Sequence, residues 1–192
     1  MIAIVKYNAG NIRSVENALR RLGADFELTD DPSKLHAAEK VIFPGVGEAS
    51  SAMHYLRERG LDQVIRELRK PFLGICLGLQ LMCLHSEEGD TACLGIFQEK
   101  ILKFPASGKV PHMGWNDFTK VHGPLFNGIL LEDNMYFVHS YYAEVGQDTS
   151  AITDYIVPFS AALQKENFYG VQFHPEKSAE AGQKLIQNFL EL

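Results

Sequence analysis

Gly74-Ile75-Cys76-Leu77-Gly78-Leu79-Gln80 joins two kinds of secondary structure. The apolar run at 72–75 follows Pro71 and predicts a short buried strand, and the residues from 77 to 85 predict a helix. A nucleophile between two glycines, at a sharp turn from strand to helix, is typical of a nucleophile elbow. A Cβ at either glycine would clash in so tight a turn. The heptapeptide therefore predicts an α/β fold with Cys76 raised clear of the sheet.

The elbow would also activate Cys76. Its sulfur would lie at a helix N-terminus, whose partial positive charge favours a thiolate over a thiol. The backbone N–H of Leu77 would point to the place where an oxyanion develops. The alternative is a buried cysteine in a glycine-rich turn, and the elbow motif alone leaves both interpretations open.

The N-terminal half alternates strands with helices. Apolar runs and helical periodicity predict strands at 2–5, 26–28, 41–43 and 72–75 and helices at 12–22, 51–59, 61–69 and 77–85. Such alternation predicts a largely parallel sheet with helices on both faces.

The pattern of predicted secondary structure changes after residue 90. Short strands joined by turns such as Asn127-Gly128 predict antiparallel additions to the sheet, and a last helix over 178–190 has Ser178 as its expected N-cap. No linker or internal repeat divides the chain, so we expect one domain over 1–192. The strands expected in this half are 96–104, 116–121, 135–138, 151–155, 161–164 and 169–173.

A base for the thiol is available in Gln172-Phe173-His174-Pro175-Glu176. If a strand runs over 169–173, its period of two places His174 and Glu176 on the same side of the chain. His174 would then take the thiol proton while Glu176 orients the imidazole. The alternative is that His174 is an ordinary histidine at a strand end.

Pro44-Gly45-Val46-Gly47 ends the third predicted strand. Ligands of open α/β sheets bind at the carboxyl ends of strands, so we expect this loop beside Cys76, with backbone amides close to a substrate. A dinucleotide-binding fingerprint is excluded because Ser50 stands where its third glycine belongs. A plain turn is the alternative.

Composition limits the class of protein. The 192 residues carry a formal charge of −6, which argues against nucleic-acid binding. Three cysteines without a Cys-x-x-Cys pair predict reduced thiols and no zinc site. No apolar run is long enough to span a membrane, and the short apolar start lacks a basic leader. We therefore expect a cytoplasmic protein with no metal.

Taken together, the elbow with Gln80, the Pro-Gly-Val-Gly loop and the His-Pro-Glu end resemble the class I, triad-type glutamine amidotransferases. Val110-Pro111-His112-Met113-Gly114-Trp115-Asn116, Tyr136-Phe137-Val138-His139-Ser140-Tyr141-Tyr142 and His174-Pro175-Glu176-Lys177-Ser178 are similar to the glutaminase subunits of imidazole glycerol phosphate synthases. The resemblance covers essentially all of 1–192. It implies a flavodoxin-like three-layer sandwich that forms a single amidotransferase domain.

The resemblance also implies an activity without a cofactor. Cys76 would attack the glutamine carboxamide to form a γ-glutamyl thioester, with His174 as the proton shuttle held by Glu176. The oxyanion would bind backbone groups of Val46, Gly47 and Leu77. The residues that match glutamine-binding positions are Gly45, Gln80, Glu88, Ser140 and Tyr141.

A partner follows from the same resemblance, because ammonia would be used by a (β/α)8-barrel cyclase subunit in histidine biosynthesis. Trp115 would suit an anchor of that interface, and the alternative is that Trp115 belongs to the core. Lys6, Asn8 and Glu48 depart from the family pattern. The residues that match the partner contact are Asn11, Met113, Gly114, Trp115, Asn116, Tyr136 and Lys177.

Two other functions stay open. One is a different triad hydrolase on this fold, such as the glutaminase of vitamin B6 synthesis or a stand-alone peptidase, although Gln80 and the segment around Trp115 argue against it. The other is a non-catalytic adaptor that binds a partner through Trp115 and 136–142, which the intact Cys, His and Glu set disfavours.

Overall fold

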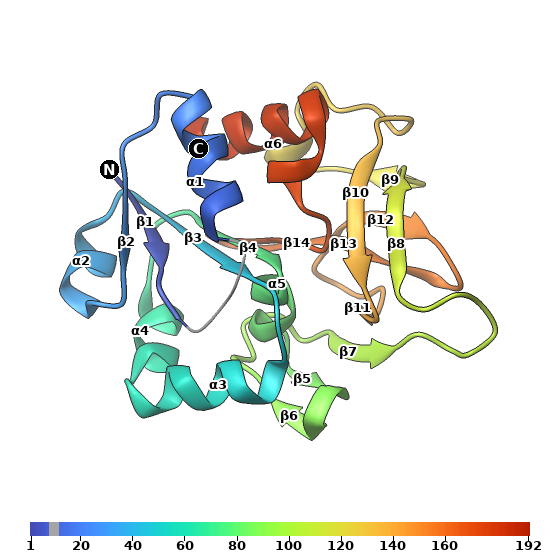
Figure 1. The fold of residues 1–192 in the computed structure, drawn as a ribbon, viewed down its shortest axis with the longest axis horizontal. Coiled ribbons are helices and arrows are strands. Elements are labelled where there is room, and N and C mark those ends of the chain that lie inside the picture. The colour runs from blue at the N-terminus through green and yellow to red at the C-terminus, as the bar shows by residue number, and fades with distance from the viewer. Residues whose placement is uncertain (8–11) are drawn as a thin grey trace.

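The computed structural model describes residues 1–7 and 12–192. The predicted interface residue Asn11 and the departure at Asn8 lie outside the described residues. Five strands run parallel in the order β2-β1-β3-β4-β14, the flavodoxin-like strand order (Figure 1). Their bounds are Ile2–Val5 (β1), Phe26–Thr29 (β2), Lys40–Gly45 (β3), Phe72–Cys76 (β4) and Phe168–Val171 (β14).

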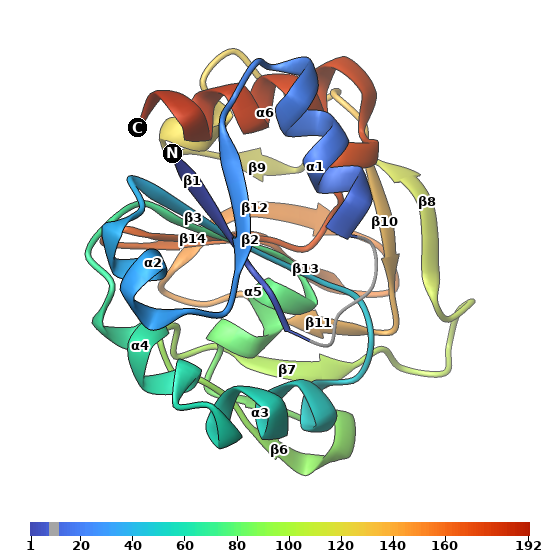
Figure 2. The same ribbon diagram turned by 60° about the vertical axis from the view of Figure 1, so that its left-hand side comes forward.

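Helices cover both faces of this parallel sheet, α1 and α6 on one face and α2 to α5 on the other (Figures 1 and 2). The period of two in β1 explains the two cores: Ile2 and Ile4 pack with α1 and α6, whereas Ala3 and Val5 pack with the other four helices. The helices span Ile12–Arg21 (α1), Pro32–Ala37 (α2), Ala49–Glu58 (α3), Leu61–Glu67 (α4), Leu77–Met82 (α5) and Ala179–Glu191 (α6). The predicted three-layer arrangement is confirmed.

Antiparallel strands extend the sheet beyond β14, as predicted. β13 pairs antiparallel with β14, β11 and β12, and β8 pairs with β10 in a separate two-stranded sheet (Figure 2). Their bounds are His85–Ser86 (β5), Thr91–Ala92 (β6), Lys100–Lys103 (β7), His112–Asn116 (β8), Lys120–Val121 (β9), Met135–His139 (β10), Tyr141–Ala143 (β11), Thr149–Asp154 (β12) and Pro158–Lys165 (β13).

Several predicted boundaries are wrong. The helix expected over 77–85 ends at Met82, and the chain at 85–86 is already strand. The strand expected over 96–104 is confined to 100–103. The strand expected over 116–121 divides into the end of β8 and the two-residue β9. An apolar run alone cannot locate these ends, because hydrogen-bonded neighbours decide where a short edge strand begins.

Helix α2 was not predicted. Its six residues bury only Leu35, so the segment shows no helical periodicity. The only sequence feature that indicates this helix lies at its start: Asp31 accepts a hydrogen bond from the backbone N–H of Ser33, and Pro32 occupies the first helical position.

Within the described part of the chain, no helix is long and apolar enough to cross a membrane.

Candidate active site

Cys76 is the last residue of β4, and α5 begins at the next residue. Its backbone has φ 54° and ψ −109°, a conformation that residues other than glycine rarely adopt. The register of the parallel sheet pairs Cys76 with Gly45, so the end of β3 lies directly beside the elbow. The predicted meeting of these two loops is confirmed.

The glycines of the elbow are required for packing. A Cβ on Gly78 would lie 1.9 Å from the carbonyl oxygen of Phe43, which is backbone and cannot move aside. A Cβ on Gly74 would lie 2.5 Å from Sδ of Met82 and 2.8 Å from the carbonyl carbon of Gly78. Helix α5 can approach β3 and β4 only because both side chains are absent, as the sequence predicts.

The backbone conformation at Cys76 predicts that a glycine variant is more stable than an alanine variant. Its dihedral angles are near the values of about 60° and −120° that glycine favours in a type II′ turn. We therefore expect Cys76→Gly to be more stable than Cys76→Ala by about 1 kcal/mol or more, because glycine relieves backbone strain that alanine keeps. Thermal unfolding should give the glycine variant a Tm roughly 2–4 °C higher. At an unstrained position alanine would be the more stable of the two, and that order would contradict the geometry described here.

His174 and Glu176 form a buried pair. Nδ1 of His174 lies 2.8 Å from Oε1 of Glu176, and both side chains are 1% exposed. Because a carboxylate only accepts, Nδ1 carries the hydrogen and donates it. The other ring nitrogen, Nε2, is buried and makes no hydrogen bond within the described residues, while the ring as a whole interacts with the Cys76 sulfur.

The surroundings of His174 favour its protonated form. Burial lowers the pKa of His174, but the interactions of the ring with the Cys76 sulfur and the Glu176 carboxylate outweigh burial and raise the pKa above its ordinary value. A protonated imidazole beside a sulfur stabilises the thiolate. The three residues predicted to form a triad are therefore brought together.

The predicted cause of the pairing of His174 with Glu176, the period of two of an extended strand, is wrong. Strand β14 ends at Val171, and 175–177 forms a 3-10 turn rather than extended chain. Ser178 stands at the predicted N-cap position but does not cap α6; its hydroxyl donates to the carbonyl oxygen of His174 at 2.6 Å and accepts from the N–H of Tyr136 at 2.9 Å. The turn, fastened in this way to β10, sets the angle between the two side chains.

The elbow opens into a cavity of about 330 Å³. This volume suits a small molecule. The lining residues that the sequence predicted are Val46, Gly47, Cys76, Leu77, Gln80, Glu88, Ser140 and Tyr141. The lining residues that it missed are Pro111, Val138 and His139.

Gly45 is not among the residues that line the cavity, although it was predicted to bind glutamine. Its structural role is to make room for Tyr7, since a Cβ on Gly45 would lie 1.9 Å from the Tyr7 hydroxyl. Burial and the nearby Cys76 raise the pKa of Tyr7, so its hydroxyl stays neutral beside the elbow.

Glu88 is half-buried at the rim of the cavity. Its Oε2 accepts a hydrogen bond of 2.8 Å from the N–H of Ala49 at the start of α3. Burial raises the pKa of Glu88, the bond from Ala49 opposes this shift, and the charge of Glu48 adds to it. Glu48 is itself exposed at the N-cap position of α3 and bonds to Ser50, so it lies outside the cavity lining.

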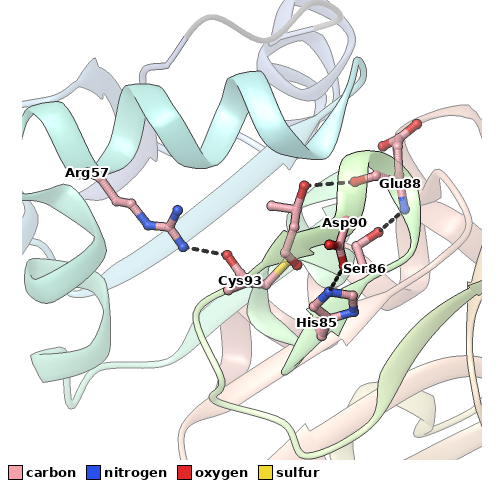
Figure 3. A network of polar contacts seen from close by, with 8 residues as sticks. Arg57, His85, Ser86, Glu88, Asp90 and Cys93 are labelled. Atoms are coloured by element: carbon pink, nitrogen blue, oxygen red, sulfur yellow. Dashed lines mark hydrogen bonds and ion pairs between the residues drawn. The ribbon is translucent and has the colours of Figure 1, made fainter.

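A polar network holds the segment that carries Glu88 (Figure 3). Ser86 Oγ accepts from the N–H of Glu88 at 3.1 Å, and His85 Nε2 lies 2.9 Å from Asp90 Oδ1. Arg57, on α3, donates a hydrogen bond to the carbonyl oxygen of Ala92, the residue before Cys93. The position of Glu88 is thus set by hydrogen bonds within its own loop and by Arg57 from helix α3.

Gln80 is buried, and its amide orientation is fixed. Its Nε2 donates to the carbonyl oxygen of Tyr141 and to Oε1 of Gln172, both at 3.0 Å. Both amide hydrogens are used by the protein, so Gln80 offers its oxygen to the cavity. Gln172 was not predicted as a site residue; the available signal was an amide in a segment that otherwise reads as buried strand.

The residues predicted to contact a partner lie on and beside the β8–β10 sheet. Trp115 is 54% exposed and Met113 61% exposed, so the alternative that Trp115 belongs to the core is wrong. Trp115 pairs with Tyr136 across the strands, with ring centroids 5.9 Å apart. A second cavity of about 500 Å³ is lined by Trp115, Glu176, Lys177, Arg21, Glu180 and Gln183.

The surface of the residues predicted to contact a partner therefore reaches the back of the candidate triad, because Glu176 lines the same cavity as Trp115 and Lys177. Gly114 lies between the exposed Met113 and Trp115 of β8, and Asn116 is the last residue of this strand. Asn116 donates through Nδ2 to the carbonyl oxygen of Asp154 at 3.0 Å. Over 1–7 and 12–192, no group of three or more His, Cys, Asp or Glu side chains could hold a metal ion.

Comparisons with known proteins agree with this geometry. The family profile described as glutamine amidotransferase class-I matches residues 3–192. The chain is similar to the imidazole glycerol phosphate synthase subunit HisH of Bacteroides fragilis, at 58% identity over 100% of this chain and 99% of that protein. The HisH subunit of Haemophilus influenzae is 47% identical, over 99% of this chain and 96% of that protein.

Solved structures share the fold at lower identity. PurLQS from Thermotoga maritima superposes with a TM-score of 0.70 at 20% identity, over 99% of this chain and 97% of that chain. A structure described as glutamine amidotransferase gives a TM-score of 0.75 at 19% identity, over 100% of this chain and 98% of that chain.

Proposed function

The chain belongs to the class-I glutamine amidotransferase family, and from this premise we propose that it is the glutaminase subunit of an imidazole glycerol phosphate synthase. It hydrolyses glutamine to glutamate and ammonia, acting as a single domain over 1–192 in the cytoplasm. The observation that carries the chemistry is that Cys76, which lines a cavity of small-molecule size, interacts with the buried His174–Glu176 pair. The similarity to HisH subunits supports the biosynthetic role.

The reaction begins with attack of the Cys76 thiolate on the side-chain carbonyl carbon of glutamine. The carbon–sulfur bond forms and the carbonyl electron pair moves to oxygen. This oxyanion is held by the N–H groups of Leu77 and of the Val46-Gly47 loop, which line the same cavity. Removing one such donor typically costs about 3–4 kcal/mol of transition-state stabilisation.

His174 then moves the protons. Its Nε2–H passes to the amide nitrogen, the carbon–nitrogen bond breaks, and ammonia leaves a γ-glutamyl thioester on Cys76. The neutral imidazole next takes a proton from water, the hydroxide attacks the thioester, and glutamate departs as the thiolate re-forms. Glu176 stabilises each imidazolium through Nδ1 without itself taking the proton.

Glutamine is oriented by the other lining residues. Glu88 brings a negative charge to the rim, where the α-ammonium of the substrate binds. Gln80 presents its amide oxygen to the cavity, and this oxygen accepts a hydrogen bond from the substrate. Ser140 and Tyr141, which line the same cavity, contribute backbone groups.

The ammonia is consumed by a partner, a (β/α)8-barrel cyclase subunit that binds over β8 and β10. Exposed apolar side chains at Met113 and Trp115, with Lys177 beside them, are the features of such a contact. Gly114, Asn116 and Tyr136 belong to the same two strands. Binding there shields ammonia from water, in which it would be protonated and lose its nucleophilic lone pair.

Mixing the chain with a cognate cyclase tests this function. We expect glutamate release to rise when the two form a complex, and Trp115→Ala to weaken that complex by roughly 30-fold in Kd, the loss of a central aromatic anchor. Titration of glutaminase activity against cyclase concentration gives both quantities. Leu130→Ala, which removes an exposed side chain outside β8 and β10, serves as the matched control.

The alternatives give different results in the same assay. Full activity without a partner would favour another triad hydrolase on this fold. A Cys76 that does not react with a glutamine-like electrophile, even with the cyclase present, would favour a non-catalytic adaptor.

A further inference from the structure

Gln172 is a fully buried amide that the reaction described above does not use. Its residue follows the end of β14, and its backbone N–H donates to the carbonyl oxygen of Ala161 at 2.8 Å. A buried amide destabilises a protein unless its side-chain atoms find partners. The partners of Gln172 are both residues of the candidate site: Oε1 meets Gln80, and Nε2 lies 3.7 Å from the sulfur of Cys76.

The direction of these bonds can be deduced from one carbonyl group. The backbone oxygen of Tyr141 can only accept, so the atom of Gln80 that faces it must be Nε2. The same nitrogen then donates to Gln172, which must present Oε1 to Gln80. The remaining atom of the Gln172 amide, Nε2, therefore points an N–H at the Cys76 sulfur.

Two buried histidines fix the Tyr141 carbonyl, with which this series of hydrogen bonds begins. His139 Nδ1 donates to it at 2.8 Å, and His139 Nε2 lies 2.9 Å from His112 Nδ1. Burial lowers the pKa of His139 to about 3 and that of His112 to about 4, so both rings are neutral. His112 accepts in turn from Asn116 at 3.3 Å, so the donors run from Asn116 through the two rings to the Tyr141 carbonyl.

The sulfur has a second contact that differs in kind. The carbonyl oxygen of Val138 lies 4.0 Å from the Cys76 sulfur and can only accept, so it interacts with the thiol and repels the thiolate. Gln172 supplies a neutral donor on another side. A hydrogen bond to the charged form of a group favours that form.

We propose, on the basis of the function given above, that Gln172 is a positioning residue: its N–H holds the Cys76 thiolate towards the cavity, and its carbonyl oxygen locks the Gln80 amide. One side chain thus couples the nucleophile to the substrate-binding wall. The coupling extends through His139 and His112 to Asn116, on the strand where the partner binds.

Two substitutions separate the functions of this amide. Gln172→Glu keeps the shape and still accepts from Gln80, but it turns a carboxylate oxygen towards the sulfur. Gln172→Met keeps the length and removes both polar atoms. Gln187→Glu on the exposed face of α6 is the matched control, and circular dichroism with urea unfolding confirms that each variant is folded.

The readout is the rate of iodoacetamide alkylation of Cys76 against pH in the isolated chain. Cys83 and Cys93 are buried, and a Cys76→Ala sample gives their background. The titratable groups beside the sulfur, His174 and Tyr7, are unchanged in every variant. We expect the midpoint of alkylation to move to higher pH in both variants, further for Gln172→Glu, and to stay in place for Gln187→Glu.

Steady-state kinetics with the cyclase complex add a second readout. We expect kcat to fall by roughly 10- to 100-fold in both variants, the range for a hydrogen bond to a charged group. The KM for glutamine should rise more in Gln172→Met, because only that variant releases Gln80. If the wild type is active and both variants keep its alkylation profile and kcat, the inference about Gln172 is wrong. An inactive wild-type complex would instead reject the proposed function.

A folding defect does not remove the test. If neither variant is folded, Gln172→Asn retains the amide but withdraws its N–H from the sulfur by one methylene. The same shift in alkylation is expected for it, and a wild-type profile would overturn the proposal.

Discussion

Replacing Cys76 with alanine should lower glutamine hydrolysis by about 10⁴-fold or more, because no other group can form the thioester. Alanine preserves the Cβ and the turn, so the cavity and the His174–Glu176 pair should remain in place. The measurement is glutamate release in the complex with the cyclase. Cys93→Ala, which removes a buried thiol outside the cavity lining, should leave this rate close to that of the wild type.

The same variant separates the two halves of the proposed complex. Synthesis by the cyclase from an added ammonium salt should survive Cys76→Ala, since ammonia supplied from solution bypasses the missing nucleophile. Glutamine hydrolysis that continues unchanged would mean that the sulfur takes no part in the reaction. Loss of the ammonium-dependent synthesis would mean that Cys76 acts on the partner rather than on glutamine.

The parts of the site that could be predicted are those fixed by local geometry. Gly74 and Gly78 flank a turn whose steric demands appear within five residues, and the structure shows the expected close approaches. His174 and Glu176 are separated by one residue, so almost any compact conformation lets them meet. Their contact was predicted correctly although the 3-10 turn that produces it was not.

The parts that could not be predicted depend on neighbours distant in sequence. Gln172 contacts Gln80, 92 positions away, and Cys76, 96 positions away, and nothing near Gln172 identifies either partner. His139 lines the cavity only because β10 turns into β11 at that point. A buried polar residue in an apolar segment is the one local sign that such a partner exists.

The short strands failed for a different reason. β5, β6 and β9 have two residues each, too few to show a period of two. Their pairing partners, such as β7 for β5 and β12 for β9, determine them. The parallel strands β1 and β4 needed no such help, because both of their faces are buried and their sequences are continuously apolar.

Gly78→Ala should lower the free energy of unfolding by about 3 kcal/mol or more, the cost of forcing an extra group into a packed core. Helix propensity alone predicts the opposite sign, since alanine stabilises a helix interior relative to glycine by about 1 kcal/mol. The steric term dominates here because the new Cβ would lie 1.9 Å from the Phe43 carbonyl oxygen, and α5 would have to move off β3.

Urea unfolding of Gly78→Ala measures this free energy directly. Gly60→Ala provides the comparison, because its added Cβ meets nothing within 4 Å and reports only the cost of a left-handed backbone, about 1 kcal/mol. Displacement of α5 in Gly78→Ala would also move the N–H of Leu77 away from the loop at Val46, so glutamine hydrolysis should fall with stability. A Gly78→Ala protein more stable than the wild type would show that α5 does not pack against β3 through this glycine.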